Sequence, residues 1–164
     1  MNRVYQVARF MALVASLGWL ASCATVTSSV TTGLATDLAD AIMNSADVET
    51  IREGVPAYLI MLDSFLRSSP DDESLLLAAS ALNGAFSALT EESRTRLLTD
   101  KSLNYAFRAS CANDAKLCGF RTMEFSQFKA RIDDLKPAQI EVIYATGVAW
   151  TGWIQAHSDD WNAI

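Results

Sequence analysis

The sequence predicts an all-α fold, because helical periodicity recurs along most of the chain and strand alternation does not. Hydrophobic residues make up 51% of the 164 residues, and they return every three or four positions. N-capping residues or prolines stand before several of these apolar runs. With only 20% charged residues, the chain is too apolar for disorder. We therefore expect one ordinary ordered domain built from helices.

The first two helices are expected to begin near Leu34 and after Asp47. Asp47 is a residue type that caps helix N-termini well, and the apolar positions behind it repeat with helical spacing. Pro56 interrupts that run. Because an interior proline costs about 3 kcal/mol, we expect a kink or a fresh helix start there. Residues 68–72 (SSPDD) predict a turn that leads into the next helix.

A third helix is predicted over about residues 75–89, where small residues alternate with large apolar ones. Thr90 is expected to cap a fourth helix that ends near Ala112. A short apolar segment follows. Pro137 then stands at a plausible first helical position and opens a long last helix that continues through Ile154.

Two sets of positions match the paired helices of a tetratricopeptide unit, in which small residues permit close helix contact. Those that match its first helix are Ile143, Thr146, Gly147 and Trp150, and those that match its second are Ser102, Ala106 and Ala109. Pro70 stands where a unit ends, about thirty residues before Ser102, whereas a standard unit has about twenty. We therefore expect tetratricopeptide-like stacked hairpins with lengthened helices.

The N-terminus has the features of an export signal. Arg3 and Arg9 precede an apolar stretch of about eleven residues, which is too short to span a bilayer as a permanent helix. A membrane anchor or a buried helix is the alternative interpretation. Residues 20–23 (LASC) resemble a bacterial lipobox, and this resemblance implies that Cys23 is acylated after signal-peptide removal. Several acyl chains on one residue give firm membrane anchoring.

These features divide the chain into three parts. We expect a lipoprotein signal peptide over residues 1–22, a lipidated flexible tether over residues 23–33 and the helical domain over residues 34–164. The protein is then expected in the periplasm, where its N-terminal lipid attaches it to the outer or the inner membrane.

Cys111 and Cys118 remain as an even pair in an oxidising compartment, where a disulfide is the default expectation. Seven residues within one continuous helix would hold their Cα atoms about 10 Å apart, too far for a disulfide. The bond therefore requires a turn between them, and Asn113 and Asp114 are suitable helix-ending residues. Two buried free thiols are the alternative.

Charge and composition argue against several classes of function. The net charge of −6 leaves no basic stripe to neutralise phosphates, so we expect no nucleic-acid partner. A single histidine leaves little material for a metal site, and we expect neither a metal nor another cofactor.

Several blocks of the chain together resemble the T-component (TatT) family of TRAP transporter systems. These blocks are residues 47–59, 74–80, 104–111, 117–119 and, above all, 149–164 (AWTGWIQAHSDDWNAI). The resemblance implies a periplasmic lipoprotein with tetratricopeptide-like helices that associates with the solute-binding P component of a TRAP transporter. It implies a role in ligand import without catalysis, and an array that continues past Ile164, so that we expect a C-terminally truncated chain. A generic lipoprotein adaptor in envelope assembly is the alternative, and self-association into a homo-oligomer stays open.

Five aromatic residues are candidates to line a groove for a ligand or a partner: Tyr58, Phe86, Tyr105, Trp150 and Trp153. Aromatic side chains are common at binding surfaces, but large aromatic residues also carry much of the burial in a protein core, so core packing is the alternative.

His157 is followed by Ser158, Asp159 and Asp160, which are residue types found in acid–base and nucleophilic sites. Neighbouring residues rarely converge on one point, since catalytic groups come from distant positions. We interpret this run as a helix C-terminus with a capping turn, and we expect no catalytic residue.

Overall fold

The computed structural model describes residues 33–161, and the described part of the chain is helical without a β-strand. The all-α prediction is confirmed. The chain divides into two compact units, residues 1–34 and 35–164, and the second contains the packed helices. A first helix covers residues 33–43, hereafter the 33–43 helix. No described helix is both long and apolar enough to cross a membrane.

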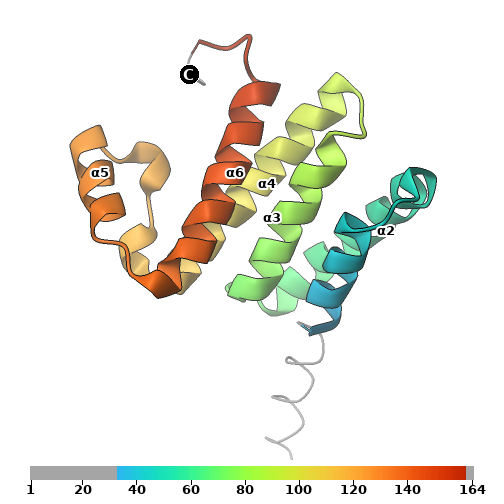
Figure 1. The fold of residues 1–164 in the computed structure, drawn as a ribbon, viewed down its shortest axis with the longest axis horizontal. Helices are drawn as coiled ribbons and strands as arrows, with labels where there is room; N and C mark the ends of the chain where they lie inside the picture. Colours follow the sequence, from blue (N-terminus) through green and yellow to red (C-terminus); the bar gives the residue numbers. More distant parts are fainter. Residues whose placement is uncertain (1–32, 162–164) are drawn as a thin grey trace, which may run out of the picture. The chain divides into compact units, whose positions relative to one another are not determined.

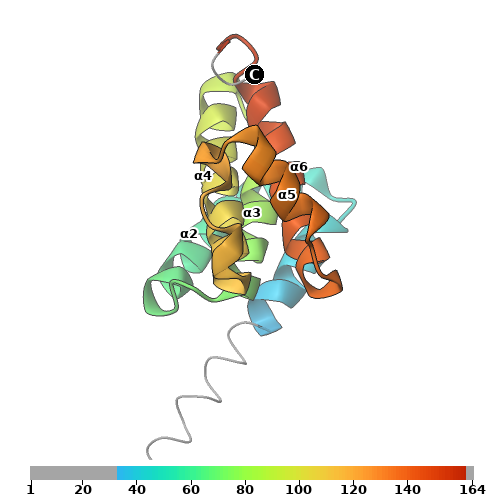
Figure 2. The ribbon, with the colours of Figure 1, turned by 90° about the vertical axis from the view of Figure 1, so that its left-hand side faces the viewer.

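The α-helices that follow are α2 (Val48–Ser68), α3 (Glu73–Ser87), α4 (Glu92–Asn113), α5 (Phe125–Asp133) and α6 (Ile140–Ala156). Three short 3₁₀ turns join the last of them, namely η1 (Ala115–Leu117), η2 (Phe120–Thr122) and η3 (Pro137–Gln139). Figure 1 shows α3, α4 and α6 side by side. Seen from the side of α5, α4 and α6 run next to each other behind it (Figure 2).

At most of the predicted helix starts, the expected capping residue or proline is found in place. The Asp47 carboxylate accepts a hydrogen bond from the Thr50 backbone N–H at 3.1 Å, and Asp72 accepts one from Leu75 at 3.0 Å. Both bonds satisfy backbone donors that a helix N-terminus leaves unpaired. Pro137 occupies the first position of η3, directly before α6.

Thr90 is not the cap of α4, contrary to expectation. The helix begins one residue later, after Glu91, which makes no side-chain capping bond. The Thr90 hydroxyl instead donates to the Ser87 carbonyl at 2.9 Å, which closes the end of α3. A threonine between two helices can satisfy either the preceding carbonyls or the following amides, and here it does the former.

The fresh start expected near Pro56 is also wrong, because α2 runs without a break from Val48 to Ser68. Buried side chains lie on both sides of the proline, among them Val55, Tyr58 and Leu62. Fully burying one such side chain is worth about 1.5–3 kcal/mol, so together they outweigh the roughly 3 kcal/mol that an interior proline costs.

The hairpin of α3 and α4 is antiparallel. Asn113 near the end of α4 donates to the Glu73 carboxylate at the start of α3, at 3.0 Å. At the other end, the Thr95 hydroxyl donates to the Ser87 carbonyl at 3.0 Å. In the middle, the ideal Cβ position of Gly84 lies 3.1 Å from Ser102 Oγ, so the glycine lets the two helices approach closely without displacing the Ser102 side chain.

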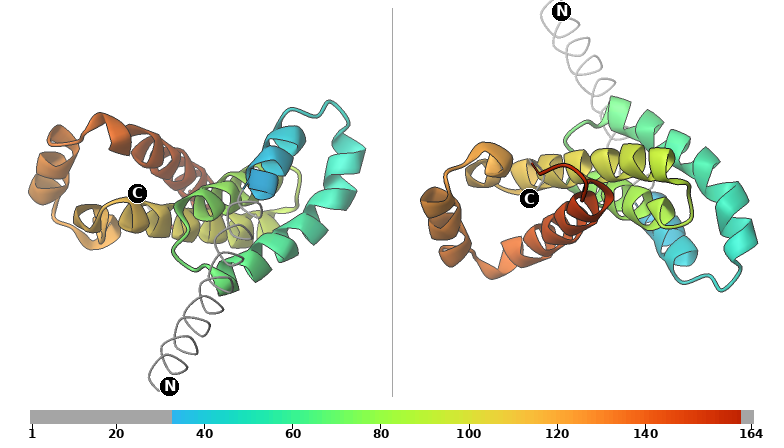
Figure 3. Two further views of the ribbon diagram at one scale, coloured as in Figure 1. Left: turned by 90° about the horizontal axis from the view of Figure 1, so that it is seen from below. Right: turned by 90° about the horizontal axis from the view of Figure 1, so that it is seen from above.

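Helix α6 packs on α4 in the same antiparallel way. Thr146 Oγ1 lies 2.8 Å from Ser110 Oγ, and the Trp153 indole N–H donates to the Asp100 carboxylate at 2.6 Å. Since both α3 and α6 run opposite to α4, they run parallel to each other. Figure 3 shows α3 between α6 on one side and the 33–43 helix with α2 on the other.

The core lies chiefly where α3 meets its neighbours. Its largest fully buried apolar side chains are Leu62, Leu76, Leu82, Leu103, Val55 and Val142. A disulfide joins Cys111 to Cys118, with the Cα atoms 4.5 Å apart. The chain turns between them because α4 ends at Asn113 and η1 follows, and the left-handed conformation of Gly119 (φ 81°) continues the turn.

Asp63 connects α2 to α4. Lys101 Nζ donates to its carboxylate at 2.8 Å, and the Tyr105 hydroxyl donates to the other oxygen. Burial raises the pKa of Asp63, but these two hydrogen bonds and the Lys101 charge outweigh burial, so the pKa lies below its ordinary value. The ionised carboxylate is therefore the form that stabilises the fold.

We predict that Leu76→Ala lowers the free energy of unfolding by about 2–5 kcal/mol, because Leu76 is fully buried in α3 and its truncation leaves a cavity. Leu97→Ala is the matched control. Leu97 is 59% exposed, so its loss is expected to change stability by about 0.5 kcal/mol or less. Urea unfolding of the oxidised protein measures both, and equal losses would contradict this placement of the core.

We predict that Tyr105→Phe weakens the acid dependence of stability. A carboxyl with a lowered pKa stabilises the fold above its ordinary value of 3.8, and this contribution is lost as pH falls through the folded value. Removing the Tyr105 hydroxyl brings the folded value closer to 3.8, so stability falls less steeply with pH. Urea midpoints measured from pH 6 down to the acid transition test this.

Tyr58→Phe is the control for that series. The Tyr58 hydroxyl donates to the Ala35 backbone carbonyl and not to a carboxylate. Its loss is expected to lower stability by a similar amount at every pH. Parallel pH profiles for the two variants would count against the role of Asp63.

Candidate binding groove

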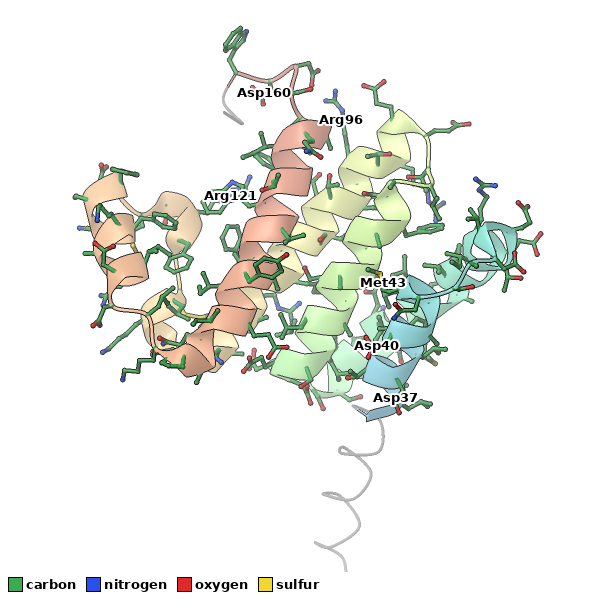
Figure 4. All side chains as sticks on the ribbon, in the orientation of Figure 1. Asp37, Asp40, Met43, Arg96, Arg121 and Asp160 are labelled. Atoms are coloured by element: carbon green, nitrogen blue, oxygen red, sulfur yellow. A yellow bond between two sulfur atoms is a disulfide. The ribbon has the colours of Figure 1, made fainter. Side chains whose placement is uncertain are left out.

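A groove of about 1160 Å³ runs along one side of α3. The 33–43 helix forms one wall, α6 forms the other, and α3 forms the floor. The residues of all three that line the groove lie in the unit that begins at Ala35. Asp40 and Met43 come from the first wall and are labelled in Figure 4.

The floor is lined by small side chains of α3, including Ala78, Ala81 and Ala85. They recur at helical spacing on the face that points away from α2 and the core residues Leu76 and Leu82. Leu77 is the one long side chain that α3 contributes to the lining, so most of the floor stays low and a partner can come close to the α3 backbone.

The α6 wall carries large apolar side chains that the fold leaves in solvent. Tyr144 is 74% exposed and Val148 is 56% exposed, and they lie one helical turn apart. A Cβ added at Gly147 would meet no atom within 4 Å, so open space lies beside these two residues. The opposite face of α6 is fixed on α4 through buried Val142 and Thr146.

The groove carries negative charge. Asp40 and Glu141 are the only charged residues among those that line it, and they stand on opposite walls. Within residues 33–161, neither forms an ion pair. The polar groups on the floor are largely engaged inside the protein, since Ser80 Oγ donates to the Ser102 carbonyl at 2.9 Å.

A model of the family described as TRAP transporter T-component matches residues 44–164. This range covers most of the chain, including the groove floor and the α6 wall. The chain belongs to the TRAP transporter T-component family. Neither the curated proteins nor the solved structures gave a match. The family assignment supports a role for this T-component in a TRAP transport system.

None of the five aromatic candidates lines the groove of this T-component. Tyr58, Phe86 and Tyr105 are buried in the core. Trp150 packs edge-to-face against Phe107 at 5.2 Å between ring centroids. These positions favour the core-packing alternative.

Trp153 lies in a polar cluster at the end of α6. Its ring stacks on the His157 imidazole at 4.6 Å, and the Arg121 guanidinium lies 5.0 Å from its centroid. Figure 4 labels Arg121, which reaches toward α6 from η2. The cluster fastens the end of α6 to α4, since Trp153 also donates to Asp100.

His157 is the C-terminal cap of α6, as interpreted from the sequence. Its Nδ1 lies 2.9 Å from the Trp153 carbonyl, and its Nε2 lies 3.6 Å from Asp100. Asp159 does not reach the imidazole as a catalytic partner would, but pairs with Arg96 at 2.7 Å. No group of three or more His, Cys, Asp or Glu side chains among the described residues could hold a metal ion.

The sequence prediction names aromatic residues and does not include the residues that line the groove, although α6 carries a signal for them. Ile140, Tyr144 and Val148 repeat every fourth residue on a face of α6 that lacks the partners of Val142 and Thr146. Cys23, the predicted lipidation site, lies outside the described residues.

Proposed function

We propose that this T-component is a lipid-anchored periplasmic scaffold that binds the solute-binding protein of its TRAP system and aids ligand uptake. The family match over residues 44–164 is the observation that carries the proposal. The groove is the surface we assign to the partner, because it combines exposed apolar side chains with a volume that the protein itself leaves open.

Membrane attachment rests on the N-terminal sequence. The run Leu20–Ala–Ser–Cys23 follows a positively charged segment and a short apolar stretch, which is the order found in lipoprotein signals. Acylated Cys23 would hold the helical domain next to the outer or the inner membrane, at the end of the tether over residues 23–33.

A binding role agrees better with the groove chemistry than catalysis does. The lining residues include neither histidine, cysteine, lysine nor arginine, so neither a strong nucleophile nor a general base other than a carboxylate is present. The two carboxylates, Asp40 and Glu141, belong to different walls. Exposed apolar surface next to small residues is typical of a protein-docking site.

We predict that the chain expressed in a bacterium fractionates with membranes and incorporates labelled palmitate, and that Cys23→Ala abolishes both. The reason is that only Cys23 follows the lipobox. The double variant Cys111→Ala/Cys118→Ala is the control, since it removes the other two thiols and is expected to remain acylated. Acylation of the Cys23→Ala chain would refute the anchor.

We predict that the acylated chain binds the TRAP solute-binding protein encoded in the same gene cluster, saturably and at micromolar concentrations. Tyr144→Ala is expected to weaken binding by about tenfold or more, as truncation of an exposed aromatic anchor does in other interfaces. Calorimetric titration measures the affinity. A solute-binding protein from an unrelated transporter serves as the negative control.

Ile60→Ala is the matched variant for that titration. Ile60 is 70% exposed but lies on α2, away from the groove. Its truncation is expected to leave the affinity unchanged. If the wild-type chain fails to bind the solute-binding protein, the proposed scaffold role is wrong.

A further inference from the structure

We propose that the groove receives an amphipathic α-helix with basic residues on its flanks, supplied by the protein partner. This inference rests on the proposed scaffold function and specifies the chemistry of the partner at the same surface. It follows from the shape of the groove, from its apolar side chains and from its charge.

The shape favours a helix. The floor is the exposed side of α3, whose 15 residues give a length of about 22 Å. The groove volume of about 1160 Å³ exceeds the range of about 300–1,000 Å³ usual for small-molecule pockets. Small side chains such as Ala81 and Ala85 let the backbone of another helix approach α3 closely.

The chemistry of the lining favours a helix over an extended peptide. A bound strand needs partners for its backbone N–H and C=O groups, but the groove is made of helices whose own backbone groups are already paired. Burying those groups of a strand on Ala, Val and Met side chains would leave them unsatisfied. A helix satisfies its backbone internally, so it needs only apolar contacts, which Met43, Tyr144 and Val148 provide.

The charge decides which helix fits. Asp40 and Glu141 stand on opposite walls, and the lining residues carry no positive charge. A helix that lies between the walls therefore places both of its flanks beside a carboxylate. Lysine or arginine on those flanks gains attraction, whereas glutamate or aspartate is repelled from both sides. The negative charge of these two carboxylates would therefore exclude acidic helices from the groove.

The test uses the acylated full chain in nanodiscs of zwitterionic lipid and two 18-residue helical peptides. Both peptides carry the same Leu/Ala face, and their flanks carry either lysines or glutamates. The lysine peptide is expected to bind about tenfold tighter or more, and this preference is expected to shrink with added salt. Because every variant is held in the same lipid, binding of peptide to lipid contributes equally to each titration.

Gly147→Leu places a side chain in the groove at a position where a Cβ meets no atom within 4 Å. It is expected to weaken binding of the lysine peptide by about tenfold or more. Gly54→Leu is the matched control: Gly54 is also an exposed helical glycine with nothing within 4 Å, but it lies on α2. It is expected to bind like the wild type.

The charge is tested with Asp40→Lys/Glu141→Lys, which is expected to reverse the preference between the two peptides. Glu53→Lys/Asp71→Lys changes the net charge equally at exposed positions outside the groove, and it is expected to preserve the preference. Equal affinity of the wild type for both peptides, or full binding by Gly147→Leu, would overturn the inference.

A parallel titration with the solute-binding protein separates this inference from the proposed function. If the lysine peptide binds in the groove and the solute-binding protein does not bind at all, only the scaffold role fails. If the solute-binding protein binds wild type and Gly147→Leu equally well, the scaffold role stands and the groove inference fails.

Discussion

The close approach of α3 and α4 is the constraint on which the groove depends. A Cβ at position 84 would stand 3.1 Å from Ser102 Oγ, so a larger residue there would displace the Ser102 side chain that joins the two helices. Ser102 donates in turn to the Ser80 carbonyl at 2.8 Å. Because α4 also binds α6 through Ser110 and Thr146, it sets the positions of α3 and α6, which form the floor and one wall of the groove.

Hydroxyl groups, as well as apolar side chains, fill the interfaces that α4 makes with α3 and α6. A buried hydroxyl is costly unless it is hydrogen-bonded, and those of Ser80, Ser102, Ser110 and Thr146 all have partners. Among the described residues, the buried side-chain atom without a partner is Oδ1 of Asn83. The bonds between Ser80 and Ser102 and between Ser110 and Thr146 join two helices, so a shift of α3 or α6 by a single turn along α4 would break them.

Most of the fold could be predicted from sequence because its signals are local. Capping by Asp47 and Asp72, the proline before α6 and the helical spacing of apolar residues each act within a few positions. The fresh helix start expected at Pro56 does not occur, because the local cost of the proline is opposed by the burial of side chains around Tyr58. The groove could not be predicted in the same way, since it depends on which face of each helix stays uncovered after packing.

The small residues of α3 serve two purposes. Gly84 and Ser80 let α4 approach, and beside them Ala81 and Ala85 form a low floor of the groove. A surface made in this way offers few directional hydrogen bonds, so it cannot select a partner by polar pattern as an enzyme pocket does. Selection must come from shape and from the two wall carboxylates, Asp40 and Glu141. Since repulsion acts on every acidic surface that approaches, these carboxylates contribute more by excluding wrong partners than by adding affinity for the right one.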